Sequence, residues 1–140
     1  MVKLKVLLTA SVLGVALQAP LGAHHSFAMF DFNTTTAFKA ATVKEFRWTN
    51  PHVVLLVEGS AKPGAAAEVW SMELTSPGNL TRMGWSRHSF KPGDKLDLQF
   101  NPLRDGKHGG AFKEAKVLAT GQVLTSSVRD YEKLEKPDIK

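Results

Sequence analysis

The stretch KLDLQF, residues 95–100, alternates polar with apolar side chains without a break. Because successive side chains of a β-strand point to opposite faces, this period of two predicts a strand with one buried and one solvated face. The buried face would carry Leu96, Leu98 and Phe100. Such a strand needs a second layer over its apolar face, so the fold depends on the runs that accompany it.

Two runs upstream of KLDLQF also have strand signatures. EVWSMELT (68–75) alternates in the same way, with Trp70, Met72 and Leu74 on one face. HVVLLVEG (52–59) is apolar on both faces, as expected of a strand that is covered from both sides. These runs indicate an all-β protein.

Two further runs predict irregular strands. In ATVKEFRW (41–48) the inward phase moves from Val43 to Phe46, which an extra residue at 44–45 would explain as a β-bulge. The last run, FKEAKVLATGQVL (112–124), is broken or bent at its glycine. Bulges and bends of this kind occur in small barrels, whose strands must curve.

One segment, SPGNLTRMGW (76–85), predicts a short helix. Ser76 can cap the first turn, Pro77 suits the first helical position, and Gly84 can adopt the left-handed conformation that ends the helix. The order is then three strands, a short helix and two strands. That order predicts an OB-fold-like small β-barrel, and a small β-sandwich is the structural alternative.

The inward phases of these segments define an expected core. We expect the barrel interior to consist of Val43, Phe46, Val53, Leu55, Val57, Trp70, Met72, Leu74, Leu80, Leu96, Leu98, Phe100, Val117 and Leu118.

The N-terminus has the pattern of a secretory signal peptide over residues 1–23. Two lysines precede the apolar run 6–17, and Ala23 supplies a small residue for cleavage before His24. The apolar run is too short for a permanent membrane anchor, which needs about 20 apolar residues. We therefore expect a periplasmic or secreted protein with an OB-like domain at 24–124 and a polar C-terminal tail at 125–140.

Removal of the signal peptide changes the charge of the chain. The mature form would keep 16 of the 18 Lys and Arg residues and all 13 Asp and Glu residues, a balance of +3 with neutral histidines. Export and this low charge argue against nucleic-acid binding, which needs a strongly basic groove. There are no cysteines, so neither disulfides nor thiolate ligands are available.

Several blocks in this order resemble a known family. AHHSFAMFD, EFRWTNPH, ELTSPGNLTRMGW and FKPGDKLDLQFNPLRDG are together similar to the small exported bacterial proteins of domain of unknown function 6152. The resemblance extends from His24 to about Leu124. It implies an exported, periplasmic protein, and it implies no activity, because the family is uncharacterised.

In an OB-like barrel, ligands bind near the loops that join strands 1 to 2 and 4 to 5. The segments FRWTNPHV and NPLRDGKHGG would form these loops, which we expect to be neighbours on one rim. The candidate ligand-binding residues on it are Trp48, Asn50, His52, Arg104, Asp105 and Lys107, with His108 beside them. Alternatively, Asn50 and Asp105 only shape turns and Trp48 belongs to the core.

The pair His24–His25 suggests a metal site. Cleavage before His24 would free an amine that chelates a metal together with its own imidazole, a ligand set that suits copper, or less specifically zinc. His25, His52 or His108 could complete the site. Histidines at a cleavage point can equally be exposed without a ligand, and His88 is expected at the surface.

No motif of a known enzyme class is present. The chain lacks the GxSxG, HExxH and GxGxxG patterns, and a base formed by His52 and Asp105 would have no nucleophile to serve. We therefore expect a non-enzymatic binding or accessory module whose partner is a periplasmic protein or a small ligand. Copper binding is the alternative function, and hydrolysis is less favoured.

Overall fold

The computed structural model describes residues 27–126 of the chain. The predicted signal peptide, His24, His25 and residues 127–140 lie outside the described residues. No helix within residues 27–126 is long and apolar enough to cross a membrane.

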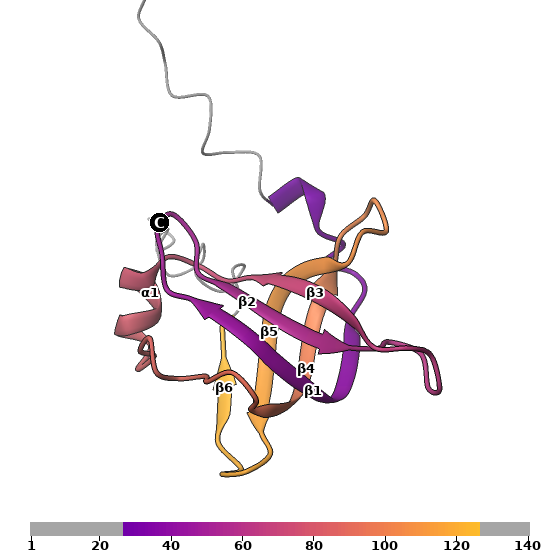
Figure 1. Ribbon diagram of the computed structural model, residues 1–140. Coiled ribbons are helices and arrows are strands. Elements are labelled where there is room, and N and C mark those ends of the chain that lie inside the picture. Colours follow the sequence, from indigo (N-terminus) through magenta and orange to yellow (C-terminus); the bar gives the residue numbers. More distant parts are fainter. Residues whose placement is uncertain (1–26, 127–140) are drawn as a thin grey trace, which may run out of the picture.

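The strands form a closed barrel (Figure 1). The elements are η1 (Phe27–Met29), β1 (Thr36–Arg47), β2 (Val54–Gly59), β3 (Glu68–Glu73), α1 (Pro77–Arg82), β4 (Lys95–Pro102), β5 (Gly109–Val117) and β6 (Val123–Thr125). The sheet order is β3-β2-β1-β4-β5-β6, and a parallel β3–β5 pairing closes the ring of β1 to β5. This topology confirms the OB-like all-β fold, with β6 added to β5 as a hairpin.

The first strand bends twice. Its register with β2 shifts between Val43 and Glu45, so the predicted bulge is confirmed. A second shift, against β4, lies between Phe38 and Ala41 and contains Ala40, whose φ of 52° is left-handed. The Asp97 carboxylate accepts the Ala40 amide hydrogen at 3.1 Å and stabilises this irregular turn of the strand.

The core matches the expected list with three exceptions. Phe46 and Trp70 are only partly buried, although both pack against the core. The expectation for Leu118 is wrong: its side chain is 43% exposed, because β5 ends at Val117 and the chain turns there towards β6. Thr125 belongs to β6 and Ser126 is fully buried, so the barrel extends beyond the predicted boundary at residue 124.

The predicted helix is present and closes one end of the barrel. The Ser76 hydroxyl accepts the Asn79 amide hydrogen at 3.4 Å, Pro77 opens the helix, and Gly84 follows it with a φ of 86°. Leu80 inserts into the core. Trp85, beyond the helix, is 3% exposed and is surrounded by other aromatic rings.

The pairing of the strands shows which loops lie at the same end of the barrel. Arg47 of β1 and Glu73 of β3 both pair with Val54, so the β1–β2 loop leaves the barrel at the end where α1 lies. The β2–β3 hairpin (60–67), the β4–β5 loop (103–108) and η1 lie at the other end (Figure 1). We call these the helix end and the hairpin end.

Candidate functional site

The structure divides the predicted rim between the two ends of β3. His52 pairs with Glu73 at the helix end, whereas His108 pairs with Glu68 at the hairpin end. The two glutamates are five positions apart along β3, which corresponds to roughly 17 Å. The prediction of a single rim is therefore wrong, because the two loops leave opposite ends of the barrel.

At the helix end, His52 and Glu73 form a side-chain pair. Nδ1 of His52 lies 2.5 Å from the Glu73 carboxylate. Burial raises the pKa of Glu73 above its ordinary value of 4.5, while the charge and the hydrogen bond of His52 act in the opposite direction. The His52–Asp105 pair considered from the sequence does not form, since Asp105 lies at the other end and pairs with Lys107.

Trp48 and Asn50 have structural roles. The Trp48 ring packs edge-to-face on Phe46, with centroids 5.8 Å apart, and is partly buried against the core. Asn50 is exposed and precedes Pro51 through a cis peptide bond in the β1–β2 loop. For these two residues the alternative interpretation fits: Asn50 shapes a turn, and Trp48 packs against the core.

At the hairpin end, the Trp70 side chain closes the barrel from inside. Its ring packs against Phe38 and Phe100 of the core, with centroids 5.2 and 5.7 Å away. The His108 ring stacks on it at a centroid distance of 4.5 Å and an interplanar angle of 23°. Nε1 of Trp70 is buried, and no acceptor among the described residues bonds to it.

A cavity of about 440 Å³ lies beside this aromatic stack. The β2–β3 hairpin and the β4–β5 loop both contribute to its lining. The lining includes Gly59, Ser60, Lys62, Glu68, Trp70 and His108. Nε2 of His108 lies 3.1 Å from the Glu68 carboxylate, and both side chains are about half exposed. The cavity therefore combines an aromatic surface with a carboxylate and an imidazole.

The β4–β5 loop has a defined turn at its tip. Asp105 accepts the Lys107 amide hydrogen at 3.1 Å and pairs with the Lys107 ammonium at 2.9 Å. These hydrogen bonds lower the pKa of Asp105. Gly106 has a φ of 77°, which favours glycine. Asp105 and Lys107 thus satisfy each other and shape the loop that presents His108.

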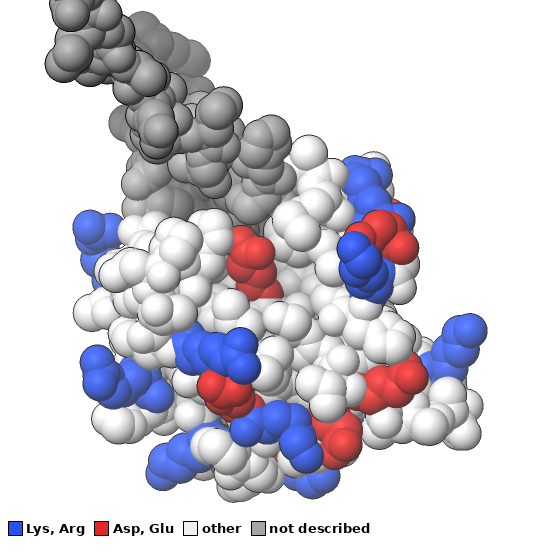
Figure 2. Space-filling model, turned by 45° about the horizontal axis from the view of Figure 1, so that its top comes forward, with Lys and Arg blue, Asp and Glu red and all other residues white. Residues whose placement is uncertain are grey.

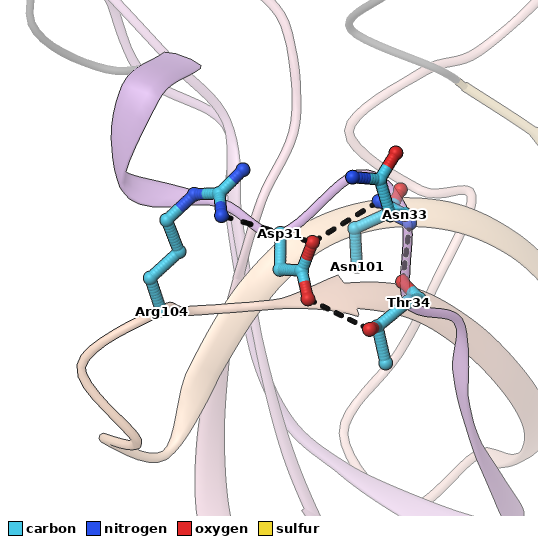
Figure 3. A network of polar contacts seen from close by, with 5 residues as sticks. All are labelled: Asp31, Asn33, Thr34, Asn101 and Arg104. Carbon is cyan, nitrogen blue, oxygen red and sulfur yellow. Dashed lines mark hydrogen bonds and ion pairs between the residues drawn. The ribbon is translucent and has the colours of Figure 1, made fainter.

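Arg104 belongs to an anchor for the N-terminal segment (Figure 3). Asp31 accepts the Thr34 hydroxyl at 2.7 Å and the Asn33 amide hydrogen, and the Arg104 guanidinium lies 3.9 Å away. These contacts, led by the Thr34 hydrogen bond, lower the pKa of Asp31. Asn101 donates to the Thr34 carbonyl at 2.7 Å. The network fixes residues 31–34 against the end of β4.

The backbone continues this anchor to η1. Arg104 donates its amide hydrogen to the Met29 carbonyl at 2.9 Å, and Phe30 forms a β-bridge with Leu103. Phe30 is 2% exposed and packs on Ala111. The first described residues therefore lie against the β4–β5 loop.

A second hollow, of about 640 Å³, adjoins the hairpin next to the bends of β1. Lys39, Lys62 and Lys95 contribute to its lining. Lys39 pairs with Asp97 at 2.9 Å, and Lys95 donates to the Thr42 hydroxyl. On the face shown in Figure 2, basic and acidic side chains are mixed around a largely uncharged centre.

The sequence alone did not single out Trp70, Glu68 or Glu73 as site residues. Each lies in a regular strand pattern, and Trp70 was assigned to the core on that basis. The one sequence feature that could have indicated these residues is the pair of glutamates at the two ends of one short strand. Which histidine lies beside each glutamate depends on the register of the strands, and the sequence does not give that register. His88 is exposed, as expected.

The described residues do not form a metal centre by themselves. Among residues 27–126, no group of three His, Asp or Glu side chains is arranged to hold a metal ion. His24 and His25 lie outside this range, so the predicted site stays a prediction.

Comparison with known proteins agrees with the resemblance seen in the sequence. A family model described as "Family of unknown function (DUF6152)" matches residues 11–113. The chain belongs to this family. No curated protein and no solved structure shows significant similarity to it. The membership identifies relatives and assigns no activity, so the function of this DUF6152 protein has to be argued from its site.

Proposed function

We propose that this protein is an exported, non-enzymatic binding module that holds a small molecule in the cavity at its hairpin end. The observation that carries the proposal is the Trp70 side chain, which lines that cavity and whose buried indole N–H has no acceptor among residues 27–126. Leaving a buried donor without a partner costs about 1–3 kcal/mol. Ser126 Oγ is also buried without a partner among residues 27–126, but Ser126 does not line this cavity. For Trp70, the cost together with the adjoining cavity favours a function in binding.

The cavity has the dimensions and the lining of a small-molecule site. Its volume of about 440 Å³ is in the usual range for ligand cavities, which combine apolar walls with a few polar groups. Trp70, on which the His108 ring stacks, provides a flat aromatic surface, and Glu68 and Lys62 provide charges at the border of the cavity. A concave site of this size suits a small ligand better than a protein surface.

The proposal includes export to the periplasm, supported by the signal-peptide pattern before His24. The intact mass of the protein recovered from the periplasmic fraction tests it. A mass that begins at His24 supports export and cleavage. A full-length product that stays in the inner membrane contradicts it.

Ligand binding can be tested with the indole N–H signals of the three tryptophans. Benzamidine, benzyl alcohol and benzoate are flat molecules of similar size that carry positive, zero and negative charge. We expect at least one of them to shift the Trp70 signal of ¹⁵N-labelled protein and to leave the Trp85 signal unchanged. If none moves the Trp70 signal, the proposed site is wrong.

Copper binding is a second candidate, favoured by the place of the N-terminal segment. Met29 and Phe30 bond to the β4–β5 loop, which carries His108. The three residues from His24 to Ser26 can span roughly 10 Å, since an extended residue covers about 3.3–3.6 Å. The amine and imidazole of His24 are therefore within reach of that loop.

Calorimetric titration with Cu(II) tests this candidate. Processed protein should bind more tightly than a form with one extra Met before His24, because the extra residue blocks the amine. Binding should weaken below about pH 7, where the amine and imidazoles become protonated. His108→Ala should weaken binding and His52→Ala should not. Equal affinity of the processed and extended forms excludes the terminal chelate.

A further inference from the structure

We infer that the cavity at the hairpin end takes a flat, nitrogen-containing ring with a cationic or hydrogen-donating edge, and that His108 occupies its place in the free protein. The inference rests on the proposed function and specifies its ligand class. It follows from the way the His108 ring is held.

The His108 side chain makes the contacts that such a ligand would make. Its flat ring stacks on Trp70, and its edge nitrogen lies 3.1 Å from the Glu68 carboxylate. Stacking on an indole face combined with a carboxylate at the ring edge is the recognition chemistry of aromatic nitrogen bases and of flat cations. The His108 ring therefore serves as a model for a ligand that would stack on Trp70 and contact Glu68.

His108 can leave without disturbing the barrel. Its backbone carbonyl accepts the Ser71 amide hydrogen at 3.2 Å, which fixes the main chain at the β3–β5 junction. Its side chain is 45% exposed, so rotation about the side-chain bonds can carry the ring into solvent. Departure of the ring would open one face of Trp70 and leave the Glu68 carboxylate unpaired.

The charge of the lining favours a cationic ligand over an anionic one once His108 has left. Glu68 then faces the vacated surface without its imidazole partner. Lys62, the cation of the lining, lies on the hairpin turn, where its amide bonds to Ser60. An anionic ring would meet Glu68 at the edge where His108 now bonds, which costs affinity.

The decisive comparison is between the wild type and His108→Ala, titrated with benzamidine. Removing the competing ring should make benzamidine bind more tightly, by roughly tenfold, since the ligand no longer displaces a ring that stacks on Trp70 and contacts Glu68. Benzoate should bind more weakly than benzamidine to both proteins. The readout is the Trp70 indole N–H shift, and His88→Ala serves as the control for an exposed histidine elsewhere.

Glu68→Gln in the His108→Ala background tests the carboxylate. We expect it to remove most of the preference for benzamidine over benzyl alcohol, while both ligands still shift the Trp70 signal. Unchanged or weaker benzamidine binding in His108→Ala overturns the inference that His108 occupies the ligand's place. Tighter binding of benzoate overturns the ligand class and leaves the binding function intact. No shift of Trp70 with any probe overturns the binding function itself.

Discussion

The two ends of the barrel are closed by different tryptophans. At the helix end, Trp85 is 3% exposed and its Nε1 donates to the Thr125 carbonyl at 3.3 Å. At the hairpin end, Trp70 is only partly buried, its Nε1 has no acceptor among residues 27–126, and its covering ring belongs to an exposed histidine. Both side chains pack on core phenylalanines.

This contrast suggests that Trp85 closes the helix end for stability, whereas Trp70 at the hairpin end serves binding. Around Trp85, Phe90 and Phe112 complete the packing, with ring centroids 5.5 and 5.4 Å away, and the one polar atom is bonded. Around Trp70, a cavity and the half-exposed side chains of His108 and Glu68 replace that packing. Packing and hydrogen bonding account for Trp85, whereas the buried N–H of Trp70, without an acceptor among residues 27–126, costs stability in a way that binding at the adjoining cavity would explain.

The largest expected loss of stability follows from removing the buried Trp85 side chain. Trp85→Ala should lower the free energy of unfolding by about 3–5 kcal/mol, because a buried aromatic side chain leaves a cavity in the core. Urea denaturation followed by circular dichroism measures the change. A loss below 1 kcal/mol would contradict the view that Trp85 seals the helix end.

A smaller loss is expected from Gly110→Ala in β5. An added Cβ would lie 2.5 Å from the Asn101 carbonyl oxygen and 2.5 Å from the Phe100 ring, so backbone and core must shift. We expect destabilisation of about 1–3 kcal/mol. Gly78→Ala in α1 is the control, since its Cβ would meet nothing within 4 Å. Equal stability of the two variants would refute the close approach of β4 and β5.

Trp70→Phe should behave unlike any change at Trp85. The substitution keeps an aromatic ring and removes the unpaired N–H, so the free energy of unfolding should change by less than about 1 kcal/mol or rise slightly. Thermal denaturation beside Trp85→Phe, which loses a bonded N–H, provides the comparison. A larger loss at Trp70 than at Trp85 would show that the hairpin end also serves stability.

The smallest effect concerns Glu73, whose pKa burial raises above 4.5. Between that value and the raised pKa, the native carboxyl keeps its proton more firmly than the unfolded chain, so the wild type loses stability as the pH rises. Glu73→Gln does not titrate. Its stability relative to the wild type should therefore increase as the pH rises from 4.5 and level off above the raised pKa, as measured by urea denaturation at each pH. A constant difference would exclude the raised pKa.

Local patterns in the sequence were sufficient for much of the fold. The alternation in KLDLQF, the phase shift after Val43 and the Ser76–Pro77 start of the helix depend on neighbours only a few residues away. Strand periodicity and helix capping are local, since they depend on residues close together in the sequence. The order of these elements then predicted the barrel.

Tertiary structure alone decided the site. The β3–β5 ladder that closes the barrel joins Ser71 to Gly109, residues far apart in the sequence, and so places His108 on Trp70 and beside Glu68. His52 meets Glu73 by the same kind of register, at the opposite end. The sequence determined which side chains the loops carry. Strand register and barrel closure, which are set by packing between distant segments, determined which of them meet.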